Sequence, residues 1–202
     1  MGTPITAPTS GDFVRILAPD GLHNAVCVDV LDRGPKQTEY GMKHKVSVHW
    51  FLDALIPVGD WTHPKTGLST PVPEAIAGKP FSIQAWFNKT MHENGSLRQM
   101  LEGWRGEVYT HAELDSFDLD SVIGVPAYVN IQYNASGDEW YANVQSVMRI
   151  PEGVEAMTVP GDYVKLRDRP PREDQEAAVG GHEEPWPDPE TSGPANDGDL
   201  PF

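Results

Sequence analysis

Alternation of apolar and polar residues is the feature that most restricts the fold of this 202-residue chain. Successive side chains of a β-strand point to opposite faces, so a strand with one buried face repeats every two residues. Five segments have strand character, either by this alternation or by a run of β-branched residues. These segments are residues 25–31, 43–50, 81–87, 125–133 and 139–149. The sequence therefore predicts a mainly β domain, with turns at residues 32–35 and 134–138.

A single helical pattern interrupts this series between the third and fourth strands. One apolar stripe recurs at i, i+3, i+4 and i+7, which is the spacing of an amphipathic helix. The stripe consists of Leu97, Met100, Leu101 and Trp104. Ser96 is suited to cap the start of this helix, and Gly106 follows its end. The resulting order β-β-β-α-β-β predicts a five-stranded OB-fold, an all-β barrel with one short helix that binds oligonucleotides or oligosaccharides.

Composition divides the chain into three parts. Residues 1–12 are rich in Gly, Pro, Thr and Ser and are expected to form a flexible N-terminal arm. Residues 13–160 are expected to form the OB-fold domain, with a long loop at 52–78 that Pro and Gly punctuate. Beyond residue 160 the apolar periodicity ends, so residues 161–202 are expected to form a disordered acidic tail.

Charge is distributed unevenly along the chain. The formal net charge of −15 argues against a generally basic surface. However, nine of the thirty acidic residues lie within residues 173–202, which contain no Lys or Arg. The rest of the chain holds 21 acids and 15 bases, so a local basic patch is compatible with the overall charge.

Cations and an aromatic ring fall on the polar faces of two neighbouring strands. Lys43, Lys45 and His49 share one face of the second strand, and Trp86 lies on the polar face of the third. Lys89 follows Trp86 by three residues and extends the cations beyond the strand. A protein that binds single strands without reading sequence needs cations for the phosphates and exposed rings for the bases. These residues are therefore candidate DNA contacts; in the alternative reading the lysines are solvated charges and Trp86 packs under the 52–78 loop.

Three further residues, two on the helix and one on the last strand, are candidate DNA contacts. Arg98 lies off the apolar stripe, where its guanidinium can meet either a phosphate or Glu102 one helical turn away. Arg105 belongs to the same helix. At the start of the last strand Trp140 and Tyr141 point to opposite faces, and we take Tyr141 as the outward-facing residue.

The remaining tryptophans are assigned by pattern. Trp50 shares a face with apolar residues of the second strand and Trp104 lies on the helical stripe, so both are assigned to the core. Trp61, in the long loop, is left open between closing over a bound strand and packing on the domain.

No motif of the sequence indicates catalysis, a metal or another cofactor. The seven histidines and the single cysteine have no zinc-ligand spacing, and no nucleophile elbow or phosphate-binding loop occurs. The sequence has no apolar stretch of signal-peptide or membrane-spanning length, which predicts a soluble protein without a membrane partner. We therefore expect a binding protein rather than an enzyme.

One long block and the end of the chain resemble known proteins. The block covers residues 91–106 and is followed by residues 117–119, with shorter matches at 25–30, 45–48 and 79–81. On these residues the chain resembles phage-encoded single-stranded DNA-binding proteins built on an OB-fold. Its last residues are similar to the acidic C-terminal tip, ending in Pro-Phe, of bacterial single-stranded DNA-binding proteins. The residues of this tip are Asp197, Asp199, Leu200, Pro201 and Phe202.

The resemblance implies a protein that binds and protects single-stranded DNA, without strong sequence preference, during phage DNA replication or recombination. The tip would recruit replication or recombination proteins, and the protein would work in the cytoplasm of the infected bacterial host. Acids tethered beside a cationic groove are also expected to compete with DNA for it. Two alternatives stay open: an OB-fold adaptor that binds other proteins, and an RNA-binding module. Self-association is left open as well.

Overall fold

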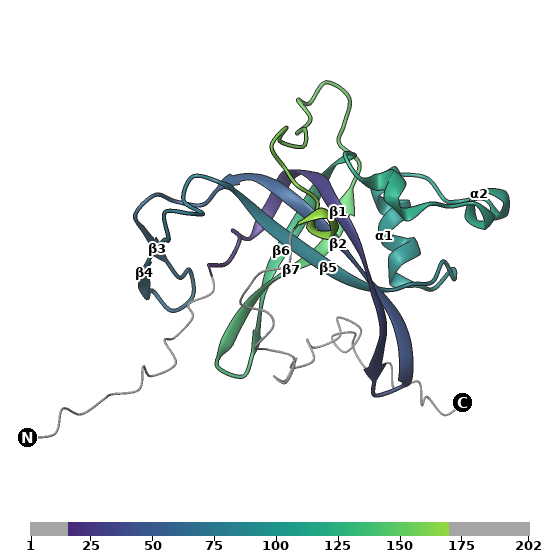
Figure 1. Cartoon of the computed structure of the whole chain (residues 1–202), viewed down its shortest axis with the longest axis horizontal. Coiled ribbons are helices and arrows are strands. Elements are labelled where there is room, and N and C mark those ends of the chain that lie inside the picture. Colours follow the sequence, from purple (N-terminus) through teal and green to yellow (C-terminus); the bar gives the residue numbers. More distant parts are fainter. Residues whose placement is uncertain (1–15, 170–202) are drawn as a thin grey trace, which may run out of the picture. The chain divides into compact units, whose positions relative to one another are not determined.

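A computed structural model describes residues 16–169 of the chain (Figure 1). The arm expected at residues 1–12 and most of the tail expected at 161–202, including the five tip residues, lie outside the described residues. Within residues 16–169 there is no helix with the length and apolar character needed to cross a membrane.

Five antiparallel strands form the main sheet, in the spatial order β5-β2-β1-β6-β7. They are β1 (Gly21–Thr38), β2 (Gly41–Leu55), β5 (Pro80–Asn88), β6 (Pro126–Ser136) and β7 (Glu139–Met148). Each of the five predicted strands is present at its expected place, and β1 and β2 extend well beyond the predicted segments. The mainly β class of the domain is therefore confirmed.

The turn predicted at residues 32–35 is wrong, because β1 continues through this segment by means of a β-bulge. The register of β1 with β2 shifts between Asp32 and Gly34, which makes Arg33 the extra residue. Gly34 adopts a φ of +68°, a conformation that favours glycine, and its N–H donates to Asp32 Oδ1 at 2.9 Å. The chain turns instead at residues 39–40, so β1 and β2 form a long two-stranded arm.

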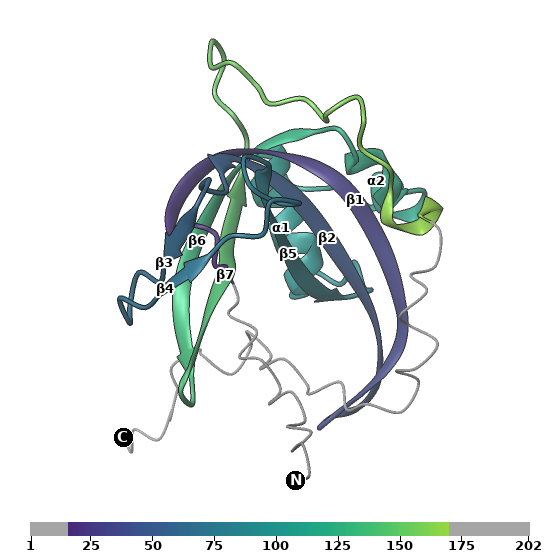
Figure 2. The ribbon, with the colours of Figure 1, turned by 60° about the vertical axis from the view of Figure 1, so that its left-hand side comes forward.

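The helix α1 (Ser96–Arg105) packs on the core side of the main sheet, as its apolar stripe predicts. Its buried residues are Leu97, Leu101 and Trp104. The ring of Trp104 lies 5.9 Å from that of Trp50, and its Nε1 donates to the carbonyl of Pro126 at 2.9 Å. Both tryptophans belong to the core, as expected. Figure 2 shows β1 and β2 bending around α1, and we call the opposite side of β1, β2 and β5 the outer face.

The helical boundaries differ from the prediction in two ways. Gly95 rather than Ser96 occupies the N-cap position, whereas Gly106 closes the helix in the left-handed conformation, with its N–H bonded to the Glu102 carbonyl at 2.8 Å. Three short elements were not predicted, because each is too brief for a periodic pattern to be visible. They are the helix α2 (His111–Asp115) and the 3-10 helices η1 (Leu119–Val122) and η2 (Leu166–Asp168).

The segment predicted as a long loop at residues 52–78 contains the end of β2 and a small hairpin. The strands β3 (Asp60–Thr62) and β4 (Ser69–Pro71) pair with each other in a separate sheet. Trp61 on β3 is 7% exposed and packs with Leu17 and Val72 in a second apolar cluster. Of the two alternatives for Trp61, packing on the domain is the one that the structure shows.

Residues 155–168, which we call the strap, continue the domain beyond the boundary expected at residue 160. The compact unit ends at Asp168. The strap contacts the outer face, where the fully buried carboxylate of Asp29 accepts hydrogen bonds from the Tyr163 hydroxyl and the Leu166 N–H. In Figure 2 the last part of the strap lies outside the arc of β1, while α1 lies inside it. A buried carboxylate requires donors, and the strap supplies them.

Candidate nucleic-acid interface

Side chains of β1, β2 and β5 form a polar patch on the outer face, which we call the Arg33–Trp86 patch. Ser47 of β2 lies opposite Trp86 of β5. Lys45 and His49 are the next residues on the same face of β2, one on each side of Ser47. The patch consists of Arg33, Lys45, Ser47, His49, Gln84 and Trp86. The structure thus brings together three residues that the sequence singled out, namely Lys45, His49 and Trp86.

The guanidinium of Arg33 occupies the centre of this patch. Its Nε donates to Ser47 Oγ at 2.8 Å, while Nη2 lies 3.4 Å from His49 Nε2 and 3.4 Å from Gln84 Oε1. Its Cζ lies 4.9 Å from the ring centroid of Trp86, within the range of a cation–π interaction. These contacts orient the guanidinium beside the Trp86 ring.

The accessible surface of the patch comes from Arg33, Gln84 and Trp86, which are partly exposed. Lys45 and His49 are only 9% and 7% exposed. The Trp86 Nε1 atom is buried and has no hydrogen-bond partner among the described residues.

The arm formed by the ends of β1 and β2 continues the outer face with two lysines. Lys36 and Lys43 lie directly opposite each other, an arrangement in which like charges destabilise a sheet. Tyr40, at the turn, is 76% exposed, and the Nζ of Lys43 lies 5.3 Å from the centroid of its ring. The arm therefore extends the combination of cations and rings found in the patch.

Lys89 lies at the edge of the sheet rather than on the outer face. Its Nζ lies 2.7 Å from Asp32 Oδ2, and the His44 ring contacts the other oxygen of the same carboxylate. The hydrogen bond from Lys89 is the main cause that holds the pKa of Asp32 well below its usual range. Lys43 and Lys89 line one shallow hollow at this edge. Lys89 therefore borders the arm, with its charge offset by Asp32.

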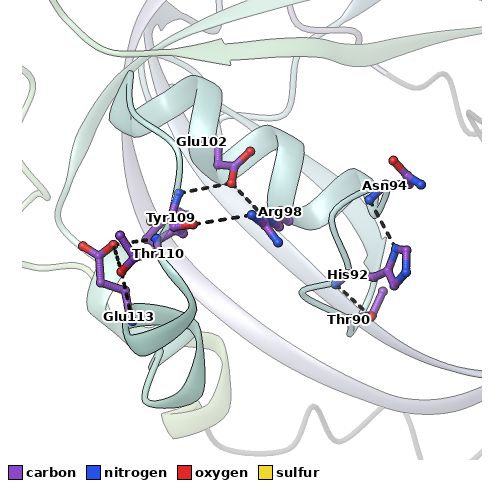
Figure 3. Close-up of polar contacts among 8 residues, drawn as sticks. All are labelled: Thr90, His92, Asn94, Arg98, Glu102, Tyr109, Thr110 and Glu113. Carbon is purple, nitrogen blue, oxygen red and sulfur yellow. Dashed lines mark hydrogen bonds and ion pairs between the residues drawn. The ribbon is translucent and has the colours of Figure 1, made fainter.

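Arg98 and Arg105 serve a different region. Arg98 links α1 to the segment that precedes α2 (Figure 3), and Arg105 links α1 to α2 itself. Arg98 Nε lies 2.8 Å from Glu102 Oε1, and the same oxygen accepts the Tyr109 N–H at 3.2 Å. This pairing lowers the pKa of Glu102. Arg105 Nη2 lies 2.7 Å from Glu113 Oε1. Both arginines therefore form salt bridges with glutamates of the same region.

Tyr141 lies on β7, which is not adjacent to β2 in the sheet. Its hydroxyl donates to Glu139 Oε2 at 2.5 Å. Trp140 packs against the second apolar cluster, so Tyr141 points away from that cluster, as expected from the alternation. The structure therefore does not bring Tyr141 into the Arg33–Trp86 patch.

Sequence reasoning missed the two cations that β1 contributes. Arg33 was assigned to a turn, and Lys36 was thereby placed outside any strand. One signal could have revealed both residues, because Asp-x-Gly inside a strand fits a β-bulge as well as a turn. A glycine at residue 41 also marks a second position at which the hairpin could close.

The patch offers charge, hydrogen-bond donors and stacking surface. These are the properties that bind an extended polyanion with planar bases. Within residues 16–169, no group of three His, Cys, Asp or Glu side chains could hold a metal ion. Burial raises the pKa of the Cys27 thiol to about 12, so the thiol stays protonated.

Comparison of the chain with protein families, with curated proteins and with solved structures found no match. The functional argument therefore rests on the geometry of this chain.

Proposed function

We propose that this protein binds single-stranded DNA through the Arg33–Trp86 patch, without strong sequence preference. The single observation that supports this most is the guanidinium of Arg33, which Ser47 and Gln84 orient beside the partly exposed ring of Trp86. Such a pair offers a phosphate contact and a stacking surface side by side. Stacking of a base on an aromatic ring contributes about 1–3 kcal/mol and depends little on sequence.

We further propose that the main sheet closes into an OB-type barrel. The order β5-β2-β1-β6-β7, with α1 between β5 and β6, supports this, because an OB-fold opened between its third and fifth strands has the same order. Contacts of β5 with β7, and of α1 with both, also favour closure. The patch then lies on the second and third barrel strands, where OB-folds bind oligonucleotides.

The biological setting completes the proposal. The protein would protect single strands during phage DNA replication or recombination, in the cytoplasm of the infected bacterial host. Its acidic tip would engage replication or recombination proteins by capture of a C-terminal carboxylate and its apolar neighbours. Support for this part comes from the sequence of residues 197–202 alone.

The test is a titration of fluorescently labelled oligo-dT, read by anisotropy, with wild-type protein and with Trp86→Ala. We expect the variant to lose about 1–3 kcal/mol of binding free energy with its fold intact, as loss of one stacked base requires. Trp86→Phe should retain most of the affinity, since it keeps an aromatic face. Arg149→Ala, a change of an exposed residue outside the patch, is the matched control and should bind as wild type.

Duplex DNA and RNA of the same sequence separate the proposal from its alternatives. Preference for single-stranded DNA that weakens as salt rises supports phosphate contacts and counterion release. Equal affinity for duplex DNA, or an affinity unchanged in Trp86→Ala, would contradict the proposed interface. Tighter binding of RNA would indicate recognition of the 2′-hydroxyl instead.

A further inference from the structure

The strap is fixed to the domain at several points along its length. The Asn24 side-chain amide donates to the carbonyl of Glu155 at 2.7 Å. Further along, Arg167 Nη1 lies 2.8 Å from Asp120 Oδ2 of η1. Tyr163 lies between these two points. The strap therefore has a defined path across the outer face.

Asp29 holds the middle of this path. Its carboxylate is fully buried, and it accepts from the Val30 N–H at 3.0 Å, the Tyr163 hydroxyl at 3.2 Å and the Leu166 N–H at 2.5 Å. A buried carboxylate without donors is strongly unfavourable, so two of the three bonds that satisfy it depend on the strap. The geometry thus couples the position of Tyr163 to the interior of the sheet.

Tyr163 is placed beside a second aromatic residue of the same outer face. Its ring meets that of Phe51 edge-on, with centroids 5.2 Å apart and an interplanar angle of 86°. Phe51 is the next outer-face residue of β2 after His49. Both rings are partly exposed, as Trp86 is.

The spacing between the two aromatic positions suits a single strand. Trp86 lies opposite Ser47, and Phe51 follows Ser47 by four residues, which corresponds to about 13 Å along the strand. Stacked nucleotides rise about 3.4 Å each along one strand, so about four nucleotides cover this distance. Lys165, two residues after Tyr163, forms no ion pair within residues 16–169. Asp162 and Asp168 are the acidic residues closest to it in the sequence.

We propose that Tyr163 and Phe51 form a second stacking platform for the same DNA strand, with Lys165 contacting a phosphate beside it. This inference rests on the proposed function, and it adds the strap to the interface. A DNA strand that runs from Trp86 along β2 and past His49 meets Phe51 and the strap before it reaches the end of β2 at Leu55. Continuity of one face favours a nucleic-acid strand over a protein segment as the occupant.

The length dependence of binding tests this proposal. Affinities are measured by anisotropy for oligo-dT of about two nucleotides, too short to reach from Trp86 to Phe51, and of about twelve nucleotides, within the usual range of one OB domain. The double variant Tyr163→Ala/Lys165→Ala should bind the short oligonucleotide as wild type, because Trp86 and Arg33 are intact. Its affinity for the long oligonucleotide should fall about tenfold, as loss of a second stacked base and a phosphate contact requires.

Two controls distinguish the possible failures. Tyr163→Phe keeps the ring and removes the bond to Asp29, so it should bind the long oligonucleotide nearly as wild type; a loss equal to that of Tyr163→Ala would overturn the stacking role. If the double variant binds both lengths as wild type while Trp86→Ala weakens both, the strap proposal is wrong and the proposed function stands. If the wild-type protein binds neither length, the proposed function itself fails.

Discussion

Two sets of arginines in this domain lie in different surroundings. Arg33, on the outer face, donates to Ser47 and Gln84 and lies beside the ring of Trp86. Arg98 and Arg105, on α1, are bonded to the carboxylates of Glu102 and Glu113. The salt bridges of Arg98 and Arg105 hold α1 to the neighbouring segment and to α2, whereas the contacts of Arg33 place its guanidinium beside a partly exposed aromatic ring. The surroundings of an arginine, and not only its place on a strand or a helix, are therefore what the variants below compare.

The largest effect on DNA affinity is expected for Arg33, and it tests whether Arg33 differs from Arg105 in binding DNA. Arg33→Ala should weaken oligo-dT binding by about 1.5–3 kcal/mol, the usual contribution of a hydrogen bond to a charged group. Arg105→Ala should change the same affinity by no more than about twofold, because it removes an exposed ion pair only. Anisotropy titrations at one low salt concentration provide the measurement.

Arg33→Lys separates the contribution of the positive charge of Arg33 from that of its planar guanidinium. Lysine keeps the charge but lacks the planar fork that bonds Ser47 and stacks on Trp86. Its affinity should therefore lie between those of wild type and Arg33→Ala. A loss in Arg105→Ala as large as that in Arg33→Ala would mean that the comparison does not separate binding from structure.

The second effect concerns stability rather than binding. Arg98→Ala leaves the Glu102 carboxylate, whose side chain is 20% exposed, without its cation. We expect the free energy of unfolding to fall by about 1–2 kcal/mol. Urea denaturation followed by tryptophan fluorescence measures it, and oligo-dT affinity should stay unchanged in the folded protein. A variant of normal stability that binds DNA poorly would place Arg98 in the interface instead.

A smaller effect is expected on the arm. Lys43→Gln should lower the slope of log affinity against log salt by about 0.7, the value for one phosphate contact on a single strand. Lys65→Gln is the matched control, since Lys65 is exposed in the segment between β3 and β4, outside the patch, the arm and the strap. The two variants should differ in slope; equal slopes would exclude Lys43 as a phosphate contact.

The smallest effect is a pH dependence on the α1–α2 side. The hydrogen bond from Arg105, with those from Thr110, lowers the pKa of Glu113 from 4.5 to about 2. Because the folded-state pKa is depressed, the stabilisation is complete above pH 4.5 and is lost as the pH falls from 4.5 towards 2. Glu113→Gln should therefore unfold with a weaker pH dependence in this window. An identical dependence in both proteins would show that Glu113 does not contribute to it.

The fold was largely predictable because its strongest signals are local. The alternation of apolar and polar residues predicted the positions of β2 and β5, and the apolar stripe predicted which residues of α1 pack in the core. What could not be predicted depends on long-range contacts. The strap looks like the start of a polar tail in sequence, and only the buried carboxylate of Asp29, more than a hundred residues earlier, explains its order.

The candidate interface was predictable only in part, for a related reason. The shared face of Lys45, His49 and Trp86 follows from alternation and from the pairing of adjacent strands. The central Arg33 was missed because a bulge and a turn have similar residue preferences, and the choice between them depends on how far the partner strand extends. Arg98 could not be decided from sequence, because a phosphate and Glu102 at i+4 satisfy a guanidinium equally well.

The extra residue in β1 reverses the faces to which the following side chains of this strand point. Had the same residues of β1 paired with β2 without the bulge, Lys36 would face Met42 instead of Lys43 and would point to the other side of the arm. The bulge therefore decides to which side of the arm Lys36 projects, and with it where the arm carries its positive charge.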